Sequence, residues 1–548
     1  MKRKRVAVAP ESEFELRRRL FGLMSELYPV DFEARRASSG WPSCDGAILW
    51  GGMAEDLSGV SAHALDCLVV AQPEGPWVPV KKGTASFGMA ASLDSCFQGQ
   101  TMLDECIESY PALRLHDGDD LVCALDGEPY WFVRRTGRTS ASVVALGPEP
   151  ISEGQTVYDQ FNRRRWLRLL PLLHFLKKLT SHDAWAPPPL RACLMIDDPN
   201  LHWPTYGFAD FRKIAQRARD LNYHVSFAMV AQDAGFVNPH VGALFRENRA
   251  ILSLCMHGND HAAAELGAAM DADSFTRLLA QGLRRIDRFE KRAGVPVSRV
   301  MVPPSGAFRE NVADPMLNLG YEAACVSRSS LTTWNPGKRW APSFGHPLAE
   351  FVGSGLPVIP RHVLAPEHSG SYRLAAFLNQ PIIPHGHHQD CADGLDVLER
   401  VASSVNSLGR VVWGDMASLS RSNYLTRRTD GTLAVRMLAR RVTLPLDEWV
   451  KEIVVERPWI PDDGTDEPLI SMQGDRVCHS LKCGRQSPAL PLQWRGSMEL
   501  ISPAPGAVNY QQTEPPRFRV WPRIRRLLCE TRDRMAPLRA RICRKRRA

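Results

Sequence analysis

The chain has 548 residues, and 44% of them are hydrophobic, which is enough apolar material for about three globular domains. Its net charge is +8, but residues 517–548 contain thirteen Lys and Arg against two acidic residues; this segment contributes +11 and leaves 8 − 11 = −3 for the rest. A nearly neutral body excludes a general electrostatic affinity for nucleic acid, and we expect no specific nucleic-acid partner.

The sequence predicts neither a membrane-spanning helix nor a secretory signal. Its most apolar stretch, 166–179, is interrupted by Pro171 and by charged residues, and falls short of the ~18 uninterrupted apolar residues of a membrane helix. Residues 1–10 are basic but lack the apolar region of a signal peptide. Thirteen cysteines, mostly scattered singly, do not resemble a disulfide framework. We therefore expect a cytoplasmic protein.

The first 155 residues predict a small α/β domain to which we assign no chemistry. Helical periodicity appears at 13–28 and 103–110, between short apolar runs. These runs lie at 46–52, 67–71, 121–124, 130–133 and 142–146. Residues 156–190 follow as a connecting segment, with a basic amphipathic helix expected at 161–179 and a proline-rich linker at 186–190.

Residues 191–428 alternate between short apolar runs and helical patterns, which is typical of a parallel sheet in an α/β protein. The expected strands lie at 193–196, 224–230, 251–256, 298–302, 323–326, 356–359, 381–383 and 410–413. The expected helices lie at 208–221, 239–248, 273–293, 312–319 and 394–407. Seven or eight such strands are most economically closed as a barrel.

Two further segments complete the predicted organisation. The apolar period changes to two at 432–442 and 449–455, so we expect a β-rich accessory domain over 429–515, built as a small sandwich. Residues 516–548 form a basic tail in which Trp521, Ile524, Leu527 and Leu528 have helical spacing. Two alternatives stay open for this tail: a helix on an anionic inner membrane surface, through 517–548, or a disordered basic segment.

Polar residues that suit a metal site follow several of the expected strands. Asp197 and Asp198 end the first strand, and two adjacent carboxylates need a cation, a shared proton or full solvation. His257 and His261 follow the strand at 251–256 and are spaced to reach one ion, and His385 follows the strand at 381–383. A carboxylate and two imidazoles with an open position indicate a hydrolytic metal site.

The motifs at 196–199 (Ile-Asp-Asp-Pro), His257/His261, 303–306 (Pro-Pro-Ser-Gly) and 383–385 (Ile-Pro-His), in this order and spacing, resemble those of the polysaccharide deacetylase family. This family includes the nodulation-type chitooligosaccharide deacetylases, within the glycoside hydrolase/deacetylase superfamily, and the resemblance covers about 190–425. It implies an α/β fold with a distorted (β/α) barrel.

The resemblance also implies roles for individual residues. Asp197 would be the general base, and Asp198, His257 and His261 would hold one divalent ion, zinc or a similar one. His385 would protonate the departing amine, a role suited to a group that titrates near neutrality. A backbone N–H of the loop 303–306, that of Ser305, would help to hold the oxyanion.

The third and fourth motifs depart from the family pattern. Val302 stands where the family has Arg, and Ser305 stands where it has Tyr. The fourth motif, 330–334, keeps Trp334 but has no Asp. The lost Arg is a cation that tunes the base in the family. We therefore predict that Arg361, which directly follows the strand at 356–359, or Arg328 replaces it near Asp197.

Weaker candidates are also present. His202 and Trp203 could line a substrate cleft, Asp415 could lie at the barrel mouth or cap a helix, and 478–483 has three soft metal-ligand residues without a partner pair.

The sequence thus predicts a metal-dependent, deacetylase-like hydrolase that acts on an N-acetylated sugar or related small amide. A cytosolic saccharide or a lipid-linked intermediate suits the expected location better than a mature cell-wall polymer. Two alternatives stay open: another C–N or glycosidic hydrolase on the same fold, and a saccharide-binding protein without catalysis. The oligomeric state is not predicted.

Overall fold

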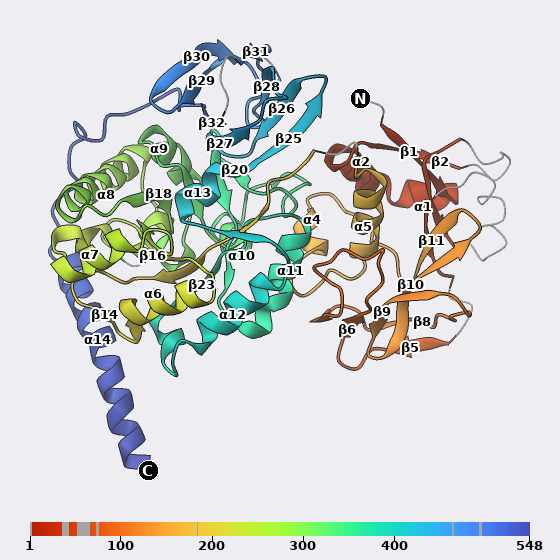
Figure 1. Ribbon diagram of the computed structural model, residues 1–548, viewed down its shortest axis with the longest axis horizontal. Coiled ribbons are helices and arrows are strands. Elements are labelled where there is room, and N and C mark those ends of the chain that lie inside the picture. The colour runs from red at the N-terminus through yellow and green to blue at the C-terminus, as the bar shows by residue number, and fades with distance from the viewer. Residues whose placement is uncertain are drawn as a thin grey trace. The chain divides into compact units, whose positions relative to one another are not determined.

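The computed structural model describes residues 3–35, 43–51, 66–72, 76–182, 185–262, 264–462, 465–492 and 496–547, with side chains up to 540. The chain forms two compact units (Figure 1). Unit 1 comprises Met1–Trp185 and Arg339–Pro347, and unit 2 comprises Ala186–Lys338 and Leu348–Ala548. No helix in the described ranges is long and apolar enough to cross a membrane.

Unit 1 is a mixed α/β unit built on one nine-stranded sheet. Five neighbouring strands are parallel: β2 (Val30–Ala34), β1 (Lys4–Ala9), β3 (Gly46–Trp50), β4 (Asp66–Val70) and β11 (Thr139–Val144). The sheet continues antiparallel through β10 (Glu128–Thr136), β9 (Asp120–Leu125), β6 (Thr84–Phe87) and β7 (Thr101–Leu103). Buried leucines of α5 (Leu170–Leu179) pack beside β4 and β11.

Two helix predictions for unit 1 are wrong. The stretch 103–110 contains no helix: it begins at the end of β7, which pairs with β6, bends at 105–106 and enters β8 (Ser109–Pro111), which pairs with β5 (Trp77–Pro79). The helix expected at 161–179 begins only at Leu170. The Asp104 carboxylate accepts hydrogen bonds from the N–H groups of Trp166 and Leu167 at 2.9 and 2.8 Å, and Pro171 lies in the first turn of α5.

Unit 2 contains a second nine-stranded sheet, in which eight neighbouring strands are parallel. In sheet order these are β22 (His362–Val363), β23 (Pro384–His387), β13 (Leu194–Asp197), β16 (Val225–Met229), β17 (Leu252–Met256), β18 (Val297–Met301), β19 (Ala323–Cys325) and β21 (Leu356–Ile359). A ninth strand, β20 (Glu350–Val352), pairs antiparallel with β21. The α/β class and the parallel pairing agree with the sequence prediction. The sheet has nine strands rather than the expected seven or eight, and the ninth strand is antiparallel.

The central strands of this sheet are buried along most or all of their length, which explains their largely apolar sequences. Every residue of β13, β16, β19 and β21 is buried. Five connecting helices lie close to their predicted positions and surround the sheet in Figure 1: α6 (Phe211–Asp220), α7 (Pro239–Glu247), α8 (Ala272–Ala293), α9 (Ala313–Asn318) and α12 (Asp396–Asn406).

Two expected strands differ from the observed ones. The strand expected at 381–383 is found at β23, three residues later, because His385 pairs in register with Met195 of β13 while Ile382 forms only an isolated bridge to Ala192. The strand expected at 410–413 is β24 (Val411–Trp413), which pairs with β12 (Leu190–Ala192) in a separate two-stranded sheet.

The C-terminal part of unit 2 contains two four-stranded sheets that share a hydrophobic core. One sheet consists of β25 (Tyr424–Thr429), β26 (Thr432–Met437), β28 (Glu452–Glu456) and β31 (Leu490–Pro491). The other consists of β27 (Arg441–Leu446), β32 (Gly496–Ile501), β29 (Glu467–Gln473) and β30 (Arg476–Cys483). The basic tail that follows is helical, as α14 (Trp521–Arg547).

Candidate metal centre

The polar side chains that follow the strands of unit 2 come together at the carboxyl edge of its parallel sheet. Asp197 is the last residue of β13, and Asp198 comes directly after it. His257 directly follows β17, and Arg361 follows β21 by two residues. His385 lies within β23, the neighbour of β13. Parallel strands end at the same edge, so strands far apart in the sequence contribute to one site.

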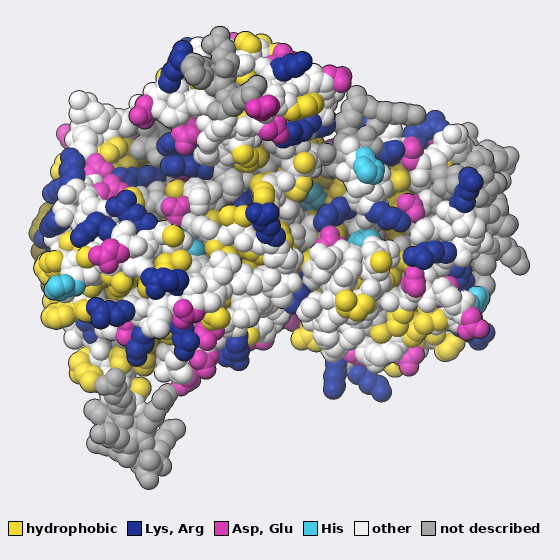
Figure 2. All heavy atoms as spheres, in the orientation of Figure 1, with side chains coloured by type: hydrophobic (Ala, Val, Ile, Leu, Met, Phe, Trp, Pro, Cys, Tyr) yellow, Lys and Arg dark blue, Asp and Glu magenta, His cyan; other side chains and the backbone are white. Residues whose placement is uncertain are grey.

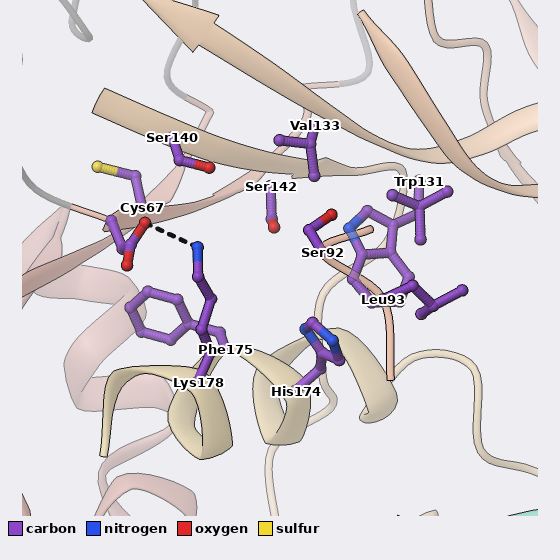
Figure 3. Close-up of a pocket in the computed structure, with 12 residues that line it drawn as sticks. Cys67, Ser92, Leu93, Trp131, Val133, Ser140, Ser142, His174, Phe175 and Lys178 are labelled. Atoms are coloured by element: carbon purple, nitrogen blue, oxygen red, sulfur yellow. Dashed lines mark hydrogen bonds and ion pairs between the residues drawn. The ribbon is translucent and has the colours of Figure 1, made fainter. Parts of the chain in front are cut away.

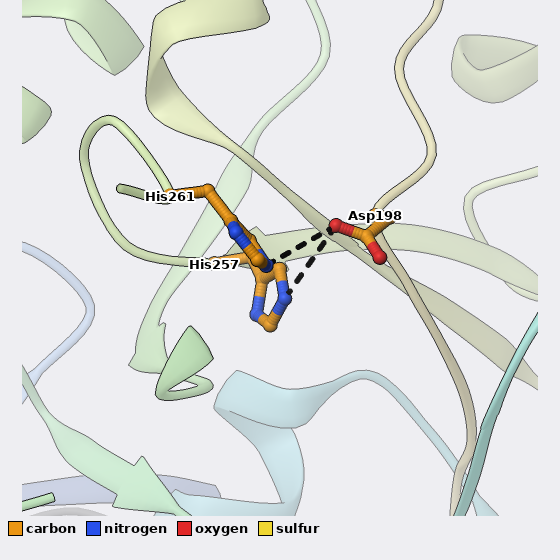
Figure 4. Close-up of side chains that lie close together, drawn as sticks. All are labelled: Asp198, His257 and His261. Atoms are coloured by element: carbon orange, nitrogen blue, oxygen red, sulfur yellow. Dashed lines mark ion pairs between the residues drawn. The ribbon is translucent and has the colours of Figure 1, made fainter. Parts of the chain in front are cut away.

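Asp198, His257 and His261 offer ligand atoms that all lie within 4.8 Å of one another. Figure 4 shows both imidazoles directed at one carboxylate oxygen. The His257 Nε2 atom is 3.8 Å from Asp198 Oδ1, and the His261 Nε2 atom is 3.4 Å from it. Within the described part of the chain, this is the one group of three or more His, Cys, Asp or Glu side chains with such spacing.

The orientation of His257 fits metal binding. Its Nδ1–H donates to the Val302 carbonyl at 2.9 Å, so Nε2 is the nitrogen with a lone pair directed at Asp198. A backbone carbonyl that fixes the tautomer in this way is the usual outer partner of a metal-binding histidine. One carboxylate and two imidazoles are also a donor set that suits zinc. The residues present therefore fit a divalent cation.

Asp197 is held separately from this group by Arg361. The carboxyl group is only 2% exposed, and Arg361 Nη1 donates to its Oδ2 at 2.8 Å. Burial alone raises the pKa of Asp197, but the charges of Arg361 and the nearby imidazoles outweigh it and hold the pKa well below its usual value. The second oxygen, Oδ1, is buried without a hydrogen-bond partner. Asp197 is thus an ionised carboxylate with one oxygen available.

Arg361 and Arg328 were the two sequence candidates for a cation near Asp197, and the structure places Arg361 there. Arg328 instead pairs with Glu350 at 2.9 Å and donates to Gln380 at 3.1 Å.

His385 is oriented for proton transfer but titrates differently from the sequence prediction. Its Nδ1–H donates to the His362 carbonyl at 2.6 Å, which leaves Nε2 unprotonated. Burial, with a smaller contribution from the Arg361 charge, lowers the pKa of His385 to about 3. The expected near-neutral titration is therefore wrong for the protein without bound metal or substrate, and His385 is neutral there.

Backbone strain is concentrated around this group. Asp198, His261 and Ser305 have φ of 81°, 48° and 57°, in the left-handed region that non-glycine residues rarely adopt. Ser305 lies in the short 3-10 helix η3 (Pro304–Gly306) and is exposed. Trp334 and Ala307, the residue directly after η3, both pack against Gly267. A Cβ added to Gly267 would lie 2.6 Å from the Trp334 ring and 2.9 Å from the Ala307 side chain. The loop lies next to His257, because a Cβ on Gly258 would come within 2.6 Å of Pro304. Among the described residues, no contact with Asp197 or Asp198 assigns Ser305 or Trp334 a role.

Two charged residues at the site were missed from the sequence. The Arg526 guanidinium, from α14, donates to the Asp198 carbonyl at 2.6 Å and lies 3.4 Å from Asp198 Oδ1. It also pairs with Asp233 Oδ2 at 2.6 Å. Asp233 follows β16 by four residues, so its position after a parallel strand was a usable signal. Arg526 gave no signal, because its contact depends on how the tail folds back.

The weaker sequence candidates have other partners. His202 contacts the Asp233 carbonyl at 3.0 Å and Glu530 of α14 at 3.2 Å, while Trp203 is exposed. Asp415 caps α13 (Met416–Arg421) by accepting the Ser418 N–H at 2.7 Å. In the segment 478–483, His479 contacts the Pro491 carbonyl and Cys483 accepts from Arg457. None of these contacts supports a second metal site among the described residues.

Comparisons with known proteins give structural likenesses only, since no protein family and no curated protein matches this sequence. The chain is similar to a carbohydrate deacetylase, Agd3, with 9% identity and a TM-score of 0.47 over 89% of this chain and 99% of that one. It is similar to a family 4 carbohydrate esterase from Streptomyces lividans, with 13% identity and a TM-score of 0.27 over 42% of this chain and 94% of that one. It is also similar to a family 4 pseudoenzyme from Bacillus anthracis, with 12% identity and a TM-score of 0.26 over 44% of this chain and 68% of that one. All three TM-scores are below 0.5, so the chemistry of the site has to be inferred from its own side chains.

Proposed function

We propose that the protein is a metal-dependent hydrolase of the polysaccharide deacetylase type, which removes acetyl from an N-acetylated sugar or a related amide. One observation carries this proposal: three ligand atoms of Asp198, His257 and His261 lie within 4.8 Å of one another, beside a buried Asp197 that Arg361 keeps ionised. A base next to a cation site is the arrangement that metal-assisted hydrolysis requires.

Asp198, His257 and His261 are the residues that would hold the ion, and zinc suits this donor set. When bound, such an ion supplies Lewis-acid polarisation of a carbonyl group and lowers the pKa of water.

Asp197 is proposed to take the proton from the attacking water. Its Oδ2 is occupied by Arg361, so Oδ1 is the atom that accepts the proton. The Arg361 charge keeps the carboxylate ionised at neutral pH, which a buried carboxyl group without a cationic partner would not be.

His385 is proposed to deliver a proton to the departing amine through Nε2, since its Nδ1–H is committed to the His362 carbonyl. Because the free imidazole is neutral, His385 has to take up this proton during the reaction before it donates. Ser305 is proposed to contribute its backbone N–H to the developing oxyanion, from a loop held in the left-handed conformation.

A second candidate function, saccharide binding without catalysis, is favoured by Arg526. Its guanidinium places a positive charge 3.4 Å from Asp198 Oδ1, where it partly neutralises a ligand carboxylate without any metal. If the positive charge of Arg526 takes the place of the ion, the site stabilises the fold and does not catalyse hydrolysis.

Acetate release from chitooligosaccharides, measured before and after treatment with a chelator and after zinc is restored, separates the two functions. The deacetylase proposal predicts release that the chelator abolishes and zinc restores. Release that is insensitive to the chelator would contradict the metal requirement. Absence of release with retained saccharide binding would favour the second candidate.

A further inference from the structure

The C-terminal helix α14 has one face fixed to unit 2. Its buried residues Arg526 and Asp533 contact the body of the unit, through Asp233 at 2.6 Å and through the Tyr206 hydroxyl at 3.1 Å. Half-buried Glu530 lies 3.2 Å from His202 Nδ1. These contacts define the inner face of α14 and fix which side of the helix is directed outward.

The outer face of α14 is apolar and has no partner among the described residues. Trp521 and Leu527 are each 65% exposed, Leu528 is 59% exposed and Ile524 is 44% exposed. Met535 and Leu538 continue the row at helical spacing and are exposed as well. A contiguous row of large apolar side chains on one helix is unusual on a free surface and indicates an interaction site.

The apolar outer face is bordered by positively charged side chains. Both acidic residues of α14 are engaged, since Glu530 pairs with His202 and with Arg534, and Asp533 contacts Tyr206 and Arg532. Exposed Arg523 and Arg539 therefore border the apolar row without a neighbouring carboxylate on that face, while exposed Arg532 pairs with Asp533 at 2.8 Å. The sequence 541–547 adds five more Lys and Arg. Figure 2 shows hydrophobic side chains beside basic ones where α14 leaves the body of unit 2, above the grey end of the chain.

We propose that the outer face of α14 docks on an anionic lipid membrane, with its apolar row in the headgroup region and its arginines on lipid phosphates. A helix that carries an apolar face bordered by Arg, with Trp at one end, has the composition of interfacial membrane helices. This proposal does not depend on the hydrolase activity.

Two other occupants fit the outer face less well. A second copy of the chain would bring two faces of the same positive charge together, which costs free energy. Nucleic acid would engage the arginines but would leave the exposed Trp521, Leu527 and Leu528 without an apolar partner.

Co-sedimentation of the full-length protein with vesicles tests the proposal. The vesicles are phosphatidylcholine alone and phosphatidylcholine mixed with phosphatidylserine. The wild type is compared with a triple variant, Trp521→Ser, Leu527→Ser and Leu528→Ser, and with Arg523→Gln and Arg539→Gln. A matched control changes three exposed apolar residues of unit 1, Trp77→Ser, Leu103→Ser and Leu121→Ser.

We expect the wild type and the control to bind the anionic vesicles and not the neutral ones. The triple variant should bind at least ten-fold more weakly, and each Arg→Gln change should weaken binding about five-fold, equivalent to about 1 kcal/mol. Absence of wild-type binding, or equal binding by the triple variant, would overturn the proposal. A dimer of the wild type that the triple variant lacks, seen by sedimentation without vesicles, would identify a second copy instead. Vesicle binding that only the Arg changes reduce, and that duplex DNA displaces, would identify nucleic acid.

Discussion

Both units contain a sheet with neighbouring parallel strands, but their polar groups are used differently. In unit 1, strand β3 ends at Trp50, and the Arg17 guanidinium lies 4.7 Å from the centre of that ring. The pocket drawn in Figure 3 is lined by Trp131 and His174, and Lys178 pairs there with Asp66 at 3.0 Å. Its volume is about 10 Å³, which is room for about one water molecule. These groups stabilise the packing and leave no space for a substrate.

In unit 2, by contrast, the strand ends carry groups that face one another. Asp198, His257 and His261 share one small volume, and Asp197 keeps an unbonded oxygen beside them. The pKa shifts have different causes as well. In unit 1, burial is the main cause that lowers the pKa of His174 to about 4. In unit 2, burial raises the pKa of Asp197, but the charge of its partner Arg361 outweighs burial and lowers the pKa. Parallel strands thus provide a shared edge in both sheets, and the residues placed at that edge decide whether polar side chains face one another there.

The largest effect is expected from removing both imidazoles of the metal centre. On the proposed function, the double change His257→Ala and His261→Ala should abolish metal binding and lower turnover by roughly 10³-fold or more, because a catalytic metal ion typically supplies several kcal/mol of transition-state stabilisation. The measurement is turnover at saturating substrate.

The matched control for this change is His174→Ala, which replaces a half-buried histidine of unit 1. It should leave turnover per folded molecule unchanged. An equal loss of turnover per folded molecule in the His174→Ala variant would show that the loss is not specific to the imidazoles of unit 2.

The next largest effect is expected from Asp197→Asn, which keeps the shape of the side chain and removes its ability to accept a proton. Turnover should fall roughly 10²–10⁴-fold, the range that general-base catalysis contributes. Metal content, measured by elemental analysis, should stay at the wild-type level. Turnover within a factor of two of wild type would rule out Asp197 as the base.

Arg361→Ala should lower turnover roughly 10–100-fold at unchanged metal content, because a residue that orients and tunes a catalytic group typically has an effect of this size. Arg361→Lys should restore part of it. Arg328→Ala provides the comparison, since Arg328 is an equally buried arginine of the same unit that pairs with Glu350. The Arg328→Ala variant should lose stability and keep its turnover per folded molecule. If Arg328→Ala instead lowers turnover and Arg361→Ala lowers only stability, then Arg328 rather than Arg361 is the residue that tunes Asp197.

The last effect concerns stability rather than turnover, as a pH dependence in unit 1. His174 has a folded pKa of about 4, below its ordinary value, so the unfolded chain binds more protons between these two values. Stability is therefore fully present above about pH 6.5 and is lost as the pH falls toward 4, by up to about 3 kcal/mol. Hydrogen exchange of α5 in the full-length protein, from pH 7 to pH 4.5, measures this loss. His174→Phe should flatten the profile, and an unchanged slope in that variant would assign the loss to other groups.

Much of the parallel sheet and its edge residues could be predicted from the sequence, because both depend on local patterns. Buried strands such as β13 and β17 have mostly apolar sequences. Asp198 and His257 follow them directly, and His261 comes four residues after His257. By the same logic, the cation near Asp197 could be predicted to be one of two arginines, Arg361 or Arg328. Arg361 was a candidate because it follows a strand that ends at the same edge.

What could not be predicted depends on contacts between distant segments. The docking of α14 rests on Arg526, which lies more than 300 residues from Asp198 in the sequence, and the tail composition was equally compatible with disorder. The low pKa of His385 results from its burial and from the charge of Arg361, neither of which a motif reveals. The position of β23 was missed for a similar reason, because register with β13 outweighed its local sequence.

The most direct test of the central claim is the metal content of the purified protein, measured in the same samples as acetate release from chitooligosaccharides. The wild type is compared with the His257→Ala and His261→Ala double variant. We predict about one zinc ion per wild-type chain, acetate release by the wild type, and loss of both in the variant. A wild type that contains no metal after purification in zinc-supplemented buffer, or a variant that keeps both metal and activity, would contradict the account.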